Sequence, residues 1–220
     1  MRYHTDLIQG TSEWLDLRIG TISASEIGVW VTKEKRTKTD EKAALNLICL
    51  KLAEKSGEEM QPFYETWAVK RGSALEPEAR KAYELESGNE VEEVGFIMHD
   101  NGMMGVSPDG LTRNRKSGVE IKAPLPQTHV KYLLDGTLPE QYKAQCHMQM
   151  AICEWEYVDF YSYSPSLPSL MVRVKRDEFT ESMLSGLLRF CYEYKAKTAI
   201  MSEKWEEMKT RQKLITTNEK

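Results

Sequence analysis

An alternating run of four side chains, Val119-Glu120-Ile121-Lys122, restricts the fold of this 220-residue chain more than any other feature. Successive side chains of a β-strand point to opposite faces of its sheet. Glu120 and Lys122 should therefore share one face of a strand, and Val119 and Ile121 the other. Such a strand has an apolar side that must be buried and a charged side that is free for chemistry. The chain is accordingly expected to contain a sheet that is covered on at least one face.

Helical and β-prone segments alternate along the rest of the chain. The segments 93–100, 102–107 and 118–124 are short and β-prone, and Asn-Gly, Asp-Gly and Ser-Gly turns separate them. Further strands are expected at 157–164 and 170–175, and helices at 12–18, 40–55, 73–86, 139–154 and 177–199. This order predicts an α/β fold in one domain, residues 1–220, with a central mixed β-sheet flanked by helices.

Three local signals refine these boundaries. Ser23 and Glu26 have the spacing of a capping box, which predicts a helix that continues through Trp30. Pro77 is expected in the first turn of its helix, where a missing N–H costs least. The charged segment 202–220 is expected to be a frayed helix or a loose end.

The composition fits a folded protein outside the membrane. Hydrophobic residues make up 40% and charged residues 29% of the chain, and no apolar run approaches the ~20 residues that a membrane helix needs. The first residues lack the basic and apolar regions of a secretion signal, so a cytoplasmic location is expected. The four cysteines are scattered without a CxxC pair, which argues against a zinc site and against a disulfide scaffold.

A net charge of −4 does not favour a nucleic-acid-binding protein. Acidic clusters that hold a metal ion lower the net charge, however, while DNA contacts need only a local basic surface. The basic stretch 33–38 offers such a surface, although stretches of this kind are more often solvated loops.

Two carboxylates and a lysine are placed to act together. Asp109 lies in a Pro-Asp-Gly turn, and hairpin pairing of the flanking strands would bring it beside Glu120. Mg²⁺ prefers oxygen ligands and takes one or two carboxylates together with a substrate phosphate. The metal activates a bound water, and a lysine such as Lys122 can orient that water and stabilise charge on the phosphate. These residues predict phosphodiester hydrolysis, whereas a Glu-x-Lys pair alone is more often a surface ion pair.

Several short motifs follow one another in a specific order. They are Glu13-Trp14, Leu17-Arg18-x-Gly20, Ser23-Ala24-Ser25-Glu26, Gly72-x-x-x-Glu76, Ser107-Pro108-Asp109-Gly110, Glu120-x-Lys122 and Ala144-Gln145. In this order they resemble the phage lambda exonuclease and YqaJ-type viral recombinase family, which belongs to the restriction-endonuclease-like nucleases. The resemblance runs from Glu13 to about Tyr163, which is most of the chain. Each motif alone is too short to identify a family, so the resemblance depends on all of them occurring in this order.

The resemblance implies a metal site built from both carboxylates. Asp109 and Glu120 would bind Mg²⁺, for which Mn²⁺ can substitute, and the backbone carbonyl of Ile121 would be a further ligand. Glu76 would hold metal-bound waters or a second ion. Lys122 would align the attacking water.

Three other residues would contact the DNA through its phosphates, again by resemblance. Gln145 would contact the active-site water or a phosphate, and Arg18 and Ser25 would hold the 5′-phosphate of the digested strand. A serine in the first turn of a helix lies near free N–H groups that favour an anion, and an arginine adds a bidentate charge-assisted contact. Taken alone, Arg18 is better explained by a surface ion pair with Asp16 or Glu13.

In the family a hydrophobic wedge splits the end of the duplex, just before the helix that carries the first acidic residue. The matching position is Val69, with Trp67 nearby. Here the chain departs from the family pattern, because Val69 is smaller than the expected leucine and Arg71 replaces an aromatic residue. Trp14 would either stack near the DNA end or pack in the core.

The implied activity is processive 5′→3′ digestion of one strand of double-stranded DNA from a 5′-phosphorylated end. It would release 5′-mononucleotides and leave a 3′ single-stranded overhang for phage recombination. A homotrimeric ring and a phage single-strand annealing protein as partner are implied as well. Two alternatives stay open: a restriction- or repair-type endonuclease of the same fold, and a catalytically silent DNA- or protein-binding module. The presence of Glu76, Asp109, Glu120 and Lys122 speaks against the silent module.

Overall fold

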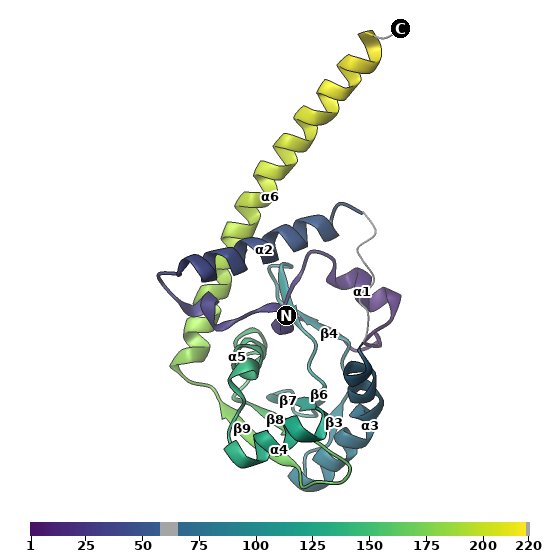
Figure 1. Cartoon of the computed structure of the whole chain (residues 1–220), viewed down its shortest axis with the longest axis vertical. Coiled ribbons are helices and arrows are strands. Elements are labelled where there is room, and N and C mark those ends of the chain that lie inside the picture. Colours follow the sequence, from purple (N-terminus) through teal and green to yellow (C-terminus); the bar gives the residue numbers. More distant parts are fainter. Residues whose placement is uncertain (58–65, 219–220) are drawn as a thin grey trace.

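Two β-sheets lie at the centre of the molecule, and helices cover them (Figure 1). The computed structural model describes residues 1–57 and 66–218, with side chains as far as Arg211. The α-helices of this part are α1 (Ser12–Arg18), α2 (Lys38–Glu54), α3 (Trp67–Ser87), α4 (Pro126–Asp135), α5 (Glu140–Cys153) and α6 (Glu178–Asn218), and two 3₁₀ turns are η1 (Ala24–Glu26) and η2 (Val29–Thr32). The strands are β1 (Arg2–His4), β2 (Ile22–Ser23), β3 (Val91–Glu92), β4 (Phe96–Met98), β5 (Met104–Val106), β6 (Gly110–Thr112), β7 (Ser117–Lys122), β8 (Tyr157–Ser162) and β9 (Leu170–Lys175).

The larger sheet contains the alternating strand, β7, at its centre. Its order is β3-β6-β7-β8-β9, with β7 and β8 parallel and the other neighbours antiparallel. Val119 and Ile121 pack against Ala79 and Tyr83 of α3 on one face. The other face of β7 meets α5, through hydrogen bonds from that helix to Glu120. The predicted mixed sheet flanked by helices is confirmed.

The smaller sheet links the N-terminal segment to the end of β5. Its order is β1-β4-β5-β2, and β2 runs parallel to β5 with Ser23 beside Gly105. β5 ends at Val106, immediately before the Ser107-Pro108-Asp109 turn. The pairing therefore brings the segment around Ser23 and the turn that holds Asp109 to the same part of the molecule.

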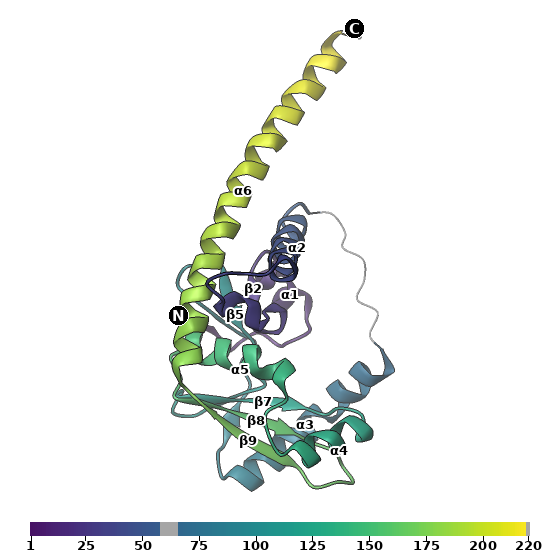
Figure 2. The ribbon, with the colours of Figure 1, turned by 60° about the vertical axis from the view of Figure 1, so that its left-hand side comes forward.

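Helix α6 has a packed half and a projecting half. The packed half lies against α5 and η2 and contributes the buried side chains Met183, Leu187, Phe190 and Tyr194. The projecting half extends away from the body (Figures 1 and 2). The helix expected to end at 199 therefore continues to Asn218, and the segment 202–218 is helical. None of the described helices is apolar over a length that could cross a membrane.

The helix expected from the Ser23 cap through Trp30 is wrong in its second half. The capping box forms as predicted. In it the Glu26 carboxylate accepts from the Ser23 backbone N–H (2.9 Å), and it also accepts from the Ser23 hydroxyl (2.7 Å). Ile27 then adopts an extended backbone conformation, which ends η1 after three residues. A second turn, η2, follows, so that Ile27 and Trp30 both enter the core.

Helix α3 starts six residues earlier than expected. Thr66 caps it by accepting a hydrogen bond from the Val69 N–H (3.3 Å). Pro77 consequently lies inside the helix and not in its first turn. A proline cannot donate to the carbonyl four residues before it, which here belongs to Ser73. Because Pro77 and Ser73 are both exposed, water can donate to that carbonyl instead.

Candidate active site

Strand β7 presents Glu120 and Lys122 on the face opposite α3, as the alternation predicts. Glu120 is buried, with 1% exposure, and its carboxylate forms an ion pair with the Lys122 ammonium. The Lys122 side chain is 28% exposed, and its nitrogen lies 5.5 Å from the centre of the Tyr142 ring. The pair thus joins a buried acid to a cation that reaches the surface.

Two amides of α5 hold the Glu120 carboxylate from the other side. Gln145 donates to one oxygen at 2.6 Å and Gln149 to the other at 2.5 Å. The two glutamines are four residues apart, so they lie on one face of the helix. Both oxygens of Glu120 are therefore fixed in direction by donors, which offset the cost of burying this polar group.

Asp109 lies directly beside β7, as the predicted hairpin requires. Its backbone N–H donates to the Val119 carbonyl (3.1 Å), and its carboxylate oxygen Oδ2 accepts from the Ile121 N–H (2.7 Å). Burial, followed by the charge of Glu120, raises the pKa of Asp109 well above its usual value. Neighbouring acids that repel one another in this way form a site that gains stability from a bound cation.

The pKa of Lys122 results from opposing effects. Burial alone would lower it, but the carboxylates of Glu120 and Asp109 outweigh burial and raise the pKa above its usual value. Lys122 is consequently a cation at neutral pH. It can donate hydrogen bonds and stabilise negative charge, and it cannot accept a proton.

Glu76 reaches the same region from α3. Arg80, one turn later, donates to Glu76 at 2.8 Å and to the Asp109 carbonyl at 3.0 Å, and it also pairs with Glu93. Burial, the largest influence, raises the pKa of Glu76. Arg80 therefore ties the helix acid to the turn that holds the strand acid.

A cleft of about 370 Å³ opens between α3 and the end of β7. Its lining residues are Ala68, Val69, Gly72, Ser73, Glu76, Asp109, Ile121, Lys122, Ala123, Pro124 and Tyr142. Two of the three acids and the lysine thus meet in one cleft, and Glu120 lies behind Lys122. The four predicted residues, distant in the sequence, are brought together.

The three acids do not form a ready-made cage for a metal ion. Among the residues that the structure describes, no three His, Cys, Asp or Glu side chains are arranged to hold a metal. Glu120 is not free to bind an ion, because its carboxylate already accepts hydrogen bonds from Gln145 and Gln149 and pairs with the Lys122 ammonium. Glu120 would have to exchange the lysine contact for a cation contact.

Asp109 and Ile121 nevertheless supply oxygens of the kind that Mg²⁺ prefers. Only Oδ2 of Asp109 accepts a hydrogen bond from the described residues, while the residue itself lines the cleft. In a strand, the N–H and C=O of one residue point to the same edge, so the Ile121 carbonyl leaves β7 on the Asp109 side. Mg²⁺ usually keeps several waters and takes few protein ligands. The residues present fit such an ion.

Arg18 and Trp14 of α1 form a second cluster near the Asp109 turn. The Arg18 guanidinium lies 4.0 Å from the centre of the Trp14 ring, and the indole N–H donates to the Gly95 carbonyl (2.8 Å) and to the Ser107 hydroxyl (3.2 Å). Ser107 is two residues before Asp109. Trp14 is therefore a fixed, partly buried support for Arg18.

The Arg18 guanidinium has unused hydrogen-bonding capacity. It donates to the Ser23 hydroxyl at 3.0 Å, but its buried Nε atom has no partner among the residues that the structure describes, and burial lowers the pKa of Arg18. Within the described residues Arg18 forms no ion pair, so the alternative of a surface pair with Asp16 or Glu13 is wrong. A partly buried arginine with an unpaired donor is suited to an anion from outside the chain.

Ser25 lies next to this cluster but not in the expected helix. Its hydroxyl is 3.4 Å from that of Ser23. The turn that contains it, η1, has only three residues, so the helix-terminus contribution to anion binding is smaller than the sequence suggested. The acids nearby are already paired, since Lys51 contacts Glu26 at 2.6 Å and Glu54 at 2.9 Å.

Comparison with known proteins bears on this geometry. A family model described as YqaJ-like viral recombinase domain matches residues 13–156, which include Arg18, Glu76, Asp109, Glu120 and Lys122. The chain belongs to this YqaJ-like viral recombinase family. The family that the motif order predicted is therefore confirmed.

Solved structures agree with the family match. An alkaline exonuclease from Laribacter hongkongensis is 30% identical with a TM-score of 0.75, over 90% of this chain and 100% of that one. The same exonuclease in complex with dAMP gives a TM-score of 0.74. A phage-related exonuclease from Haemophilus somnus shares the fold at 15% identity and a TM-score of 0.54, over 83% of this chain and 96% of that one. The comparison with curated proteins gives no match.

Two contributors to the site of this YqaJ-like domain were absent from the sequence-based set. Gln149 holds the second oxygen of Glu120, and Arg80 joins Glu76 to the Asp109 turn. A signal existed in both cases, because each is four residues from a predicted site residue on the same helix, Gln145 and Glu76 respectively.

The candidate wedge residues lie at the start of α3. Val69 is 39% exposed and lines the cleft, and Trp67 is 71% exposed, so Trp67 is not a core residue. Arg71 donates to the carbonyls of Ala123 (3.3 Å) and Pro124 (2.9 Å). It thereby fixes the start of α3 to the segment that follows β7.

Proposed function

We propose that the chain is a Mg²⁺-dependent exonuclease that digests one strand of double-stranded DNA in the 5′→3′ direction. It releases 5′-mononucleotides and leaves a 3′ single-stranded overhang. The exonuclease class is supported by the family and by the similarity to the Laribacter alkaline exonuclease. The observation that carries the proposal for this chain is the cleft in which Glu76, Asp109 and Lys122 meet, in front of the buried Glu120.

The proposed roles follow from the position of each group. Asp109, Glu120 and the Ile121 carbonyl would hold the metal ion, and Glu76 would hold its waters or a second ion. The bound ion supplies an activated water and neutralises charge on the phosphate, with Mn²⁺ as a substitute. Lys122, a permanent cation with free donor capacity toward the cleft, orients the attacking water and stabilises the charge that develops on the phosphate.

Gln145 is proposed to act on Glu120 before it acts on the substrate. It donates to the same Glu120 oxygen that contacts Lys122. This hydrogen bond holds the carboxylate that would bind the metal ion, and the Gln145 amide would contact the active-site water or a phosphate. Gln149 fixes the other oxygen throughout.

Arg18 and Ser25 are proposed to bind the 5′-phosphate of the strand that is digested. The Nε of Arg18, which no described residue pairs with, and the stack on Trp14 support this assignment, because an arginine held by packing presents its donors at little cost in side-chain entropy. Val69, exposed at the mouth of the cleft, is the proposed wedge between the strands. Trp14, whose ring contacts the Arg18 guanidinium, is the proposed stacking residue near the DNA end.

The proposal extends to assembly and partners. A homotrimeric ring with the DNA in its channel would explain how a chain with a net charge of −4 stays on its substrate. A phage single-strand annealing protein would receive the 3′ strand, and the bacterial cytoplasm would be the place of action.

One assay tests the activity and separates it from its alternatives. Linear duplex DNA with 5′-phosphoryl or 5′-hydroxyl ends and closed circular duplex are incubated with the purified chain in Mg²⁺ or EDTA, and the products are separated by size. We expect 5′-mononucleotides from the linear 5′-phosphorylated duplex only, and only in Mg²⁺. Cleavage of the circle would indicate an endonuclease, and binding without cleavage a silent module. Asp109→Asn, which keeps the shape of the side chain and removes its charge, serves as the inactive control.

A further inference from the structure

The projecting half of α6 carries a row of three apolar side chains and one threonine on one face. Thr198, Met201, Trp205 and Met208 follow one another at spacings of three and four residues, which places them in one stripe along a helix. Met201, Trp205 and Met208 are 42%, 43% and 69% exposed. We refer to these four residues as the α6 seam.

The α6 seam continues a buried row of the packed half. Leu187, Cys191 and Tyr194 precede Thr198 at spacings of four, three and four residues, and all three are buried in the body. The spacing passes from the packed half to the projecting half without interruption. The two halves of α6 thus share one continuous apolar face, and the body of the molecule covers only the half that is packed against it.

The flanks of the seam change where the helix leaves the body. Every seventh residue along one flank reads Met183, Phe190, Lys197, Lys204 and Arg211. Met183 and Phe190 are buried, whereas the three basic residues are exposed. In the packed half the apolar face of α6 is broad, as suits a protein core. In the projecting half it narrows to two positions per seven residues, with charged residues on both sides. This is the pattern of a helix that pairs with one other helix.

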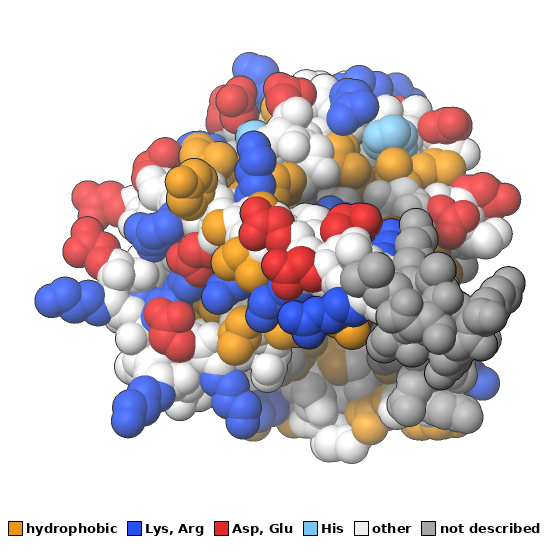
Figure 3. All heavy atoms as spheres, turned by 90° about the horizontal axis from the view of Figure 1, so that it is seen from above, with side chains coloured by type: hydrophobic (Ala, Val, Ile, Leu, Met, Phe, Trp, Pro, Cys, Tyr) orange, Lys and Arg blue, Asp and Glu red, His pale blue; other side chains and the backbone are white. Residues whose placement is uncertain are grey.

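The second flank is basic as well, and the acids lie away from the seam. Lys195 and Lys209 occupy the second flank, while Glu203, Glu206 and Glu207 lie on the outer side of the helix. Lys209 also contacts Glu206 at 3.0 Å, but an exposed pair of this kind contributes little and leaves the ammonium available. Seen from above, on the side from which α6 projects, the surface of the molecule shows acidic and basic side chains interspersed with apolar ones (Figure 3).

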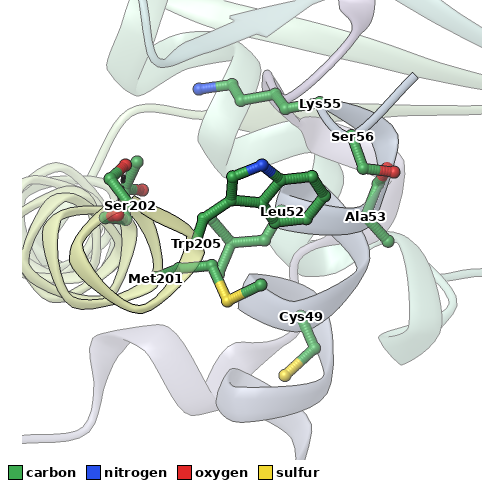
Figure 4. A pocket seen from close by; sticks show the side chains of 9 residues that line it. Cys49, Leu52, Ala53, Lys55, Ser56, Met201, Ser202 and Trp205 are labelled. Atoms are coloured by element: carbon green, nitrogen blue, oxygen red, sulfur yellow. Dashed lines mark hydrogen bonds between the residues drawn. The ribbon is translucent and has the colours of Figure 1, made fainter. Parts of the chain in front are cut away.

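The base of the seam opens into a groove against α2. The groove has a volume of about 630 Å³, and Met201 and Trp205 line it together with Leu52, Ala53 and Lys55. Figure 4 shows Trp205 and Met201 of α6 turned toward the α2 side chains, with Lys55 at the edge. A second helix laid along the seam would therefore end in an apolar notch with one more cation beside it.

We propose that the α6 seam and this groove bind an amphipathic helix with acidic flanks from a partner protein. An apolar stripe in the partner would pack on Met201, Trp205 and Met208, and its acidic flanks would face the two basic rows. Because both flanks of the seam are basic, the same acidic partner is complementary in the parallel and in the antiparallel direction.

The charges disfavour two other occupants. If a second copy of α6 paired with this one, lysines and arginines would face one another in either direction, which is destabilising. Duplex DNA would satisfy the basic rows but would leave three exposed apolar side chains between them without a partner. The acidic helix satisfies both features together.

Synthetic peptides provide the test, used with the full chain. The probe is a labelled four-heptad peptide with Leu at the two seam positions and Glu on both flanks, and the control peptide carries Lys on the flanks. Fluorescence anisotropy is followed as the protein is titrated. We expect the acidic peptide to bind at least 10-fold more tightly than the basic one. Equal binding of both, or of neither, would overturn the proposal.

Variants locate the site and separate the occupants. Met208→Glu should weaken binding of the acidic peptide at least 10-fold, whereas Thr210→Glu, with the same new charge on the outer side of the helix, should leave it unchanged. Combined K204E, K209E and R211E should reverse the peptide preference. Nuclease activity of each variant on a short duplex should match that of the parent. A change of oligomeric state in Met208→Glu would assign the seam to contacts between copies of the chain. A loss of duplex binding in the charge-reversed variant as large as its loss of acidic-peptide binding would assign the seam to DNA. Either result would contradict the acidic-helix proposal.

Discussion

Lys122 is the residue whose loss should separate catalysis from binding. Its ammonium is held by Glu120 and faces the cleft, so Lys122→Ala removes the cation that is proposed to stabilise charge on the phosphate and leaves the acids in place. We expect turnover to fall by a factor of 10³ or more, which matches about 4 kcal/mol of transition-state stabilisation. Binding of duplex ends, measured by anisotropy, should change less than threefold. A Lys122→Ala protein with normal turnover would contradict the assigned role.

Gln149 should matter for the rate although it does not line the cleft. Gln149→Leu leaves one oxygen of the buried Glu120 without a donor, and such a loss costs about 1–3 kcal/mol. We expect kcat to fall about 10-fold with little change in KM for duplex DNA, because the carboxylate is misplaced and the DNA contacts are intact. Gln141→Leu, on the same helix but bonded to Tyr132, is the control and should keep its kcat. A parallel fall in both variants would point to a general effect on α5.

Arg18 is predicted to bind the phosphate at the 5′ end of the DNA strand and not the phosphates along its backbone. Arg18→Ala should reduce the preference for 5′-phosphorylated over 5′-hydroxyl ends about 10-fold or more, since a charge-assisted contact contributes roughly 1.5–3 kcal/mol. Initial rates on the two substrates give the ratio. Lys35→Ala, in the basic stretch 33–38, is the matched loss of one positive charge and should leave the ratio as it is. An unchanged ratio in Arg18→Ala would remove the phosphate assignment.

Among the elements, those with an apolar period were predicted well, and those set by tertiary contacts were not. β7, β8, β9, α1 and α5 follow from alternation or helical spacing. Helix α4 was missed although Pro126 at its first position and Gly136 after its end are regular boundary signals. The turn after η1 was misread, because the extended backbone of Ile27 depends on the core that receives Ile27 and Trp30. Residue spacing carries no information about that core.

The same division holds for the site. Alternation along β7 predicted that Glu120 and Lys122 share a face, and the hairpin predicted that Asp109 lies beside it. The occupation of both Glu120 oxygens by Gln145 and Gln149 could not be derived, because it depends on how α5 lies across the sheet. The support of Arg18 by Trp14 likewise depends on the contact between α1 and Gly95, the residue before β4.

Helix α6 is held to the body at a position where only glycine fits. A Cβ atom on Gly186 would lie 2.1 Å from the Val31 carbonyl oxygen of η2, and a backbone atom cannot move aside as a flexible side chain can. We therefore expect Gly186→Ala to lower the free energy of unfolding by about 1–3 kcal/mol or more, as overpacking does. Urea denaturation measures the change. Ser185→Ala, at the exposed neighbouring position, is the control and should stay within about 0.5 kcal/mol; a Gly186→Ala protein as stable as this control would show that α6 can shift.

At the scale of the whole molecule, an acidic chain has to bind a polyanion. The net charge of −4 gives no long-range attraction for DNA, so a complex held by a few local phosphate contacts should weaken steeply with salt, with a slope of about −0.9 per contact on a logarithmic scale. If the proposed trimeric ring encloses the duplex, salt should weaken the loading of the protein onto DNA but not its retention after loading. Loading from solution remains salt-dependent, whereas a ring already on the DNA cannot leave sideways.

Salt applied before and after loading should therefore act differently. We expect an increase from 50 to 200 mM salt before mixing to reduce the initial rate of digestion at least 10-fold, because loading depends on charge contacts. The same increase after loading, together with an excess of unlabelled duplex, should leave the length digested per binding event within about twofold. Light scattering should give three times the mass of the chain. Equal sensitivity of the two arms, or a monomeric mass, would mean that ionic contacts alone hold the DNA, and an acidic protein of this kind could then not be processive.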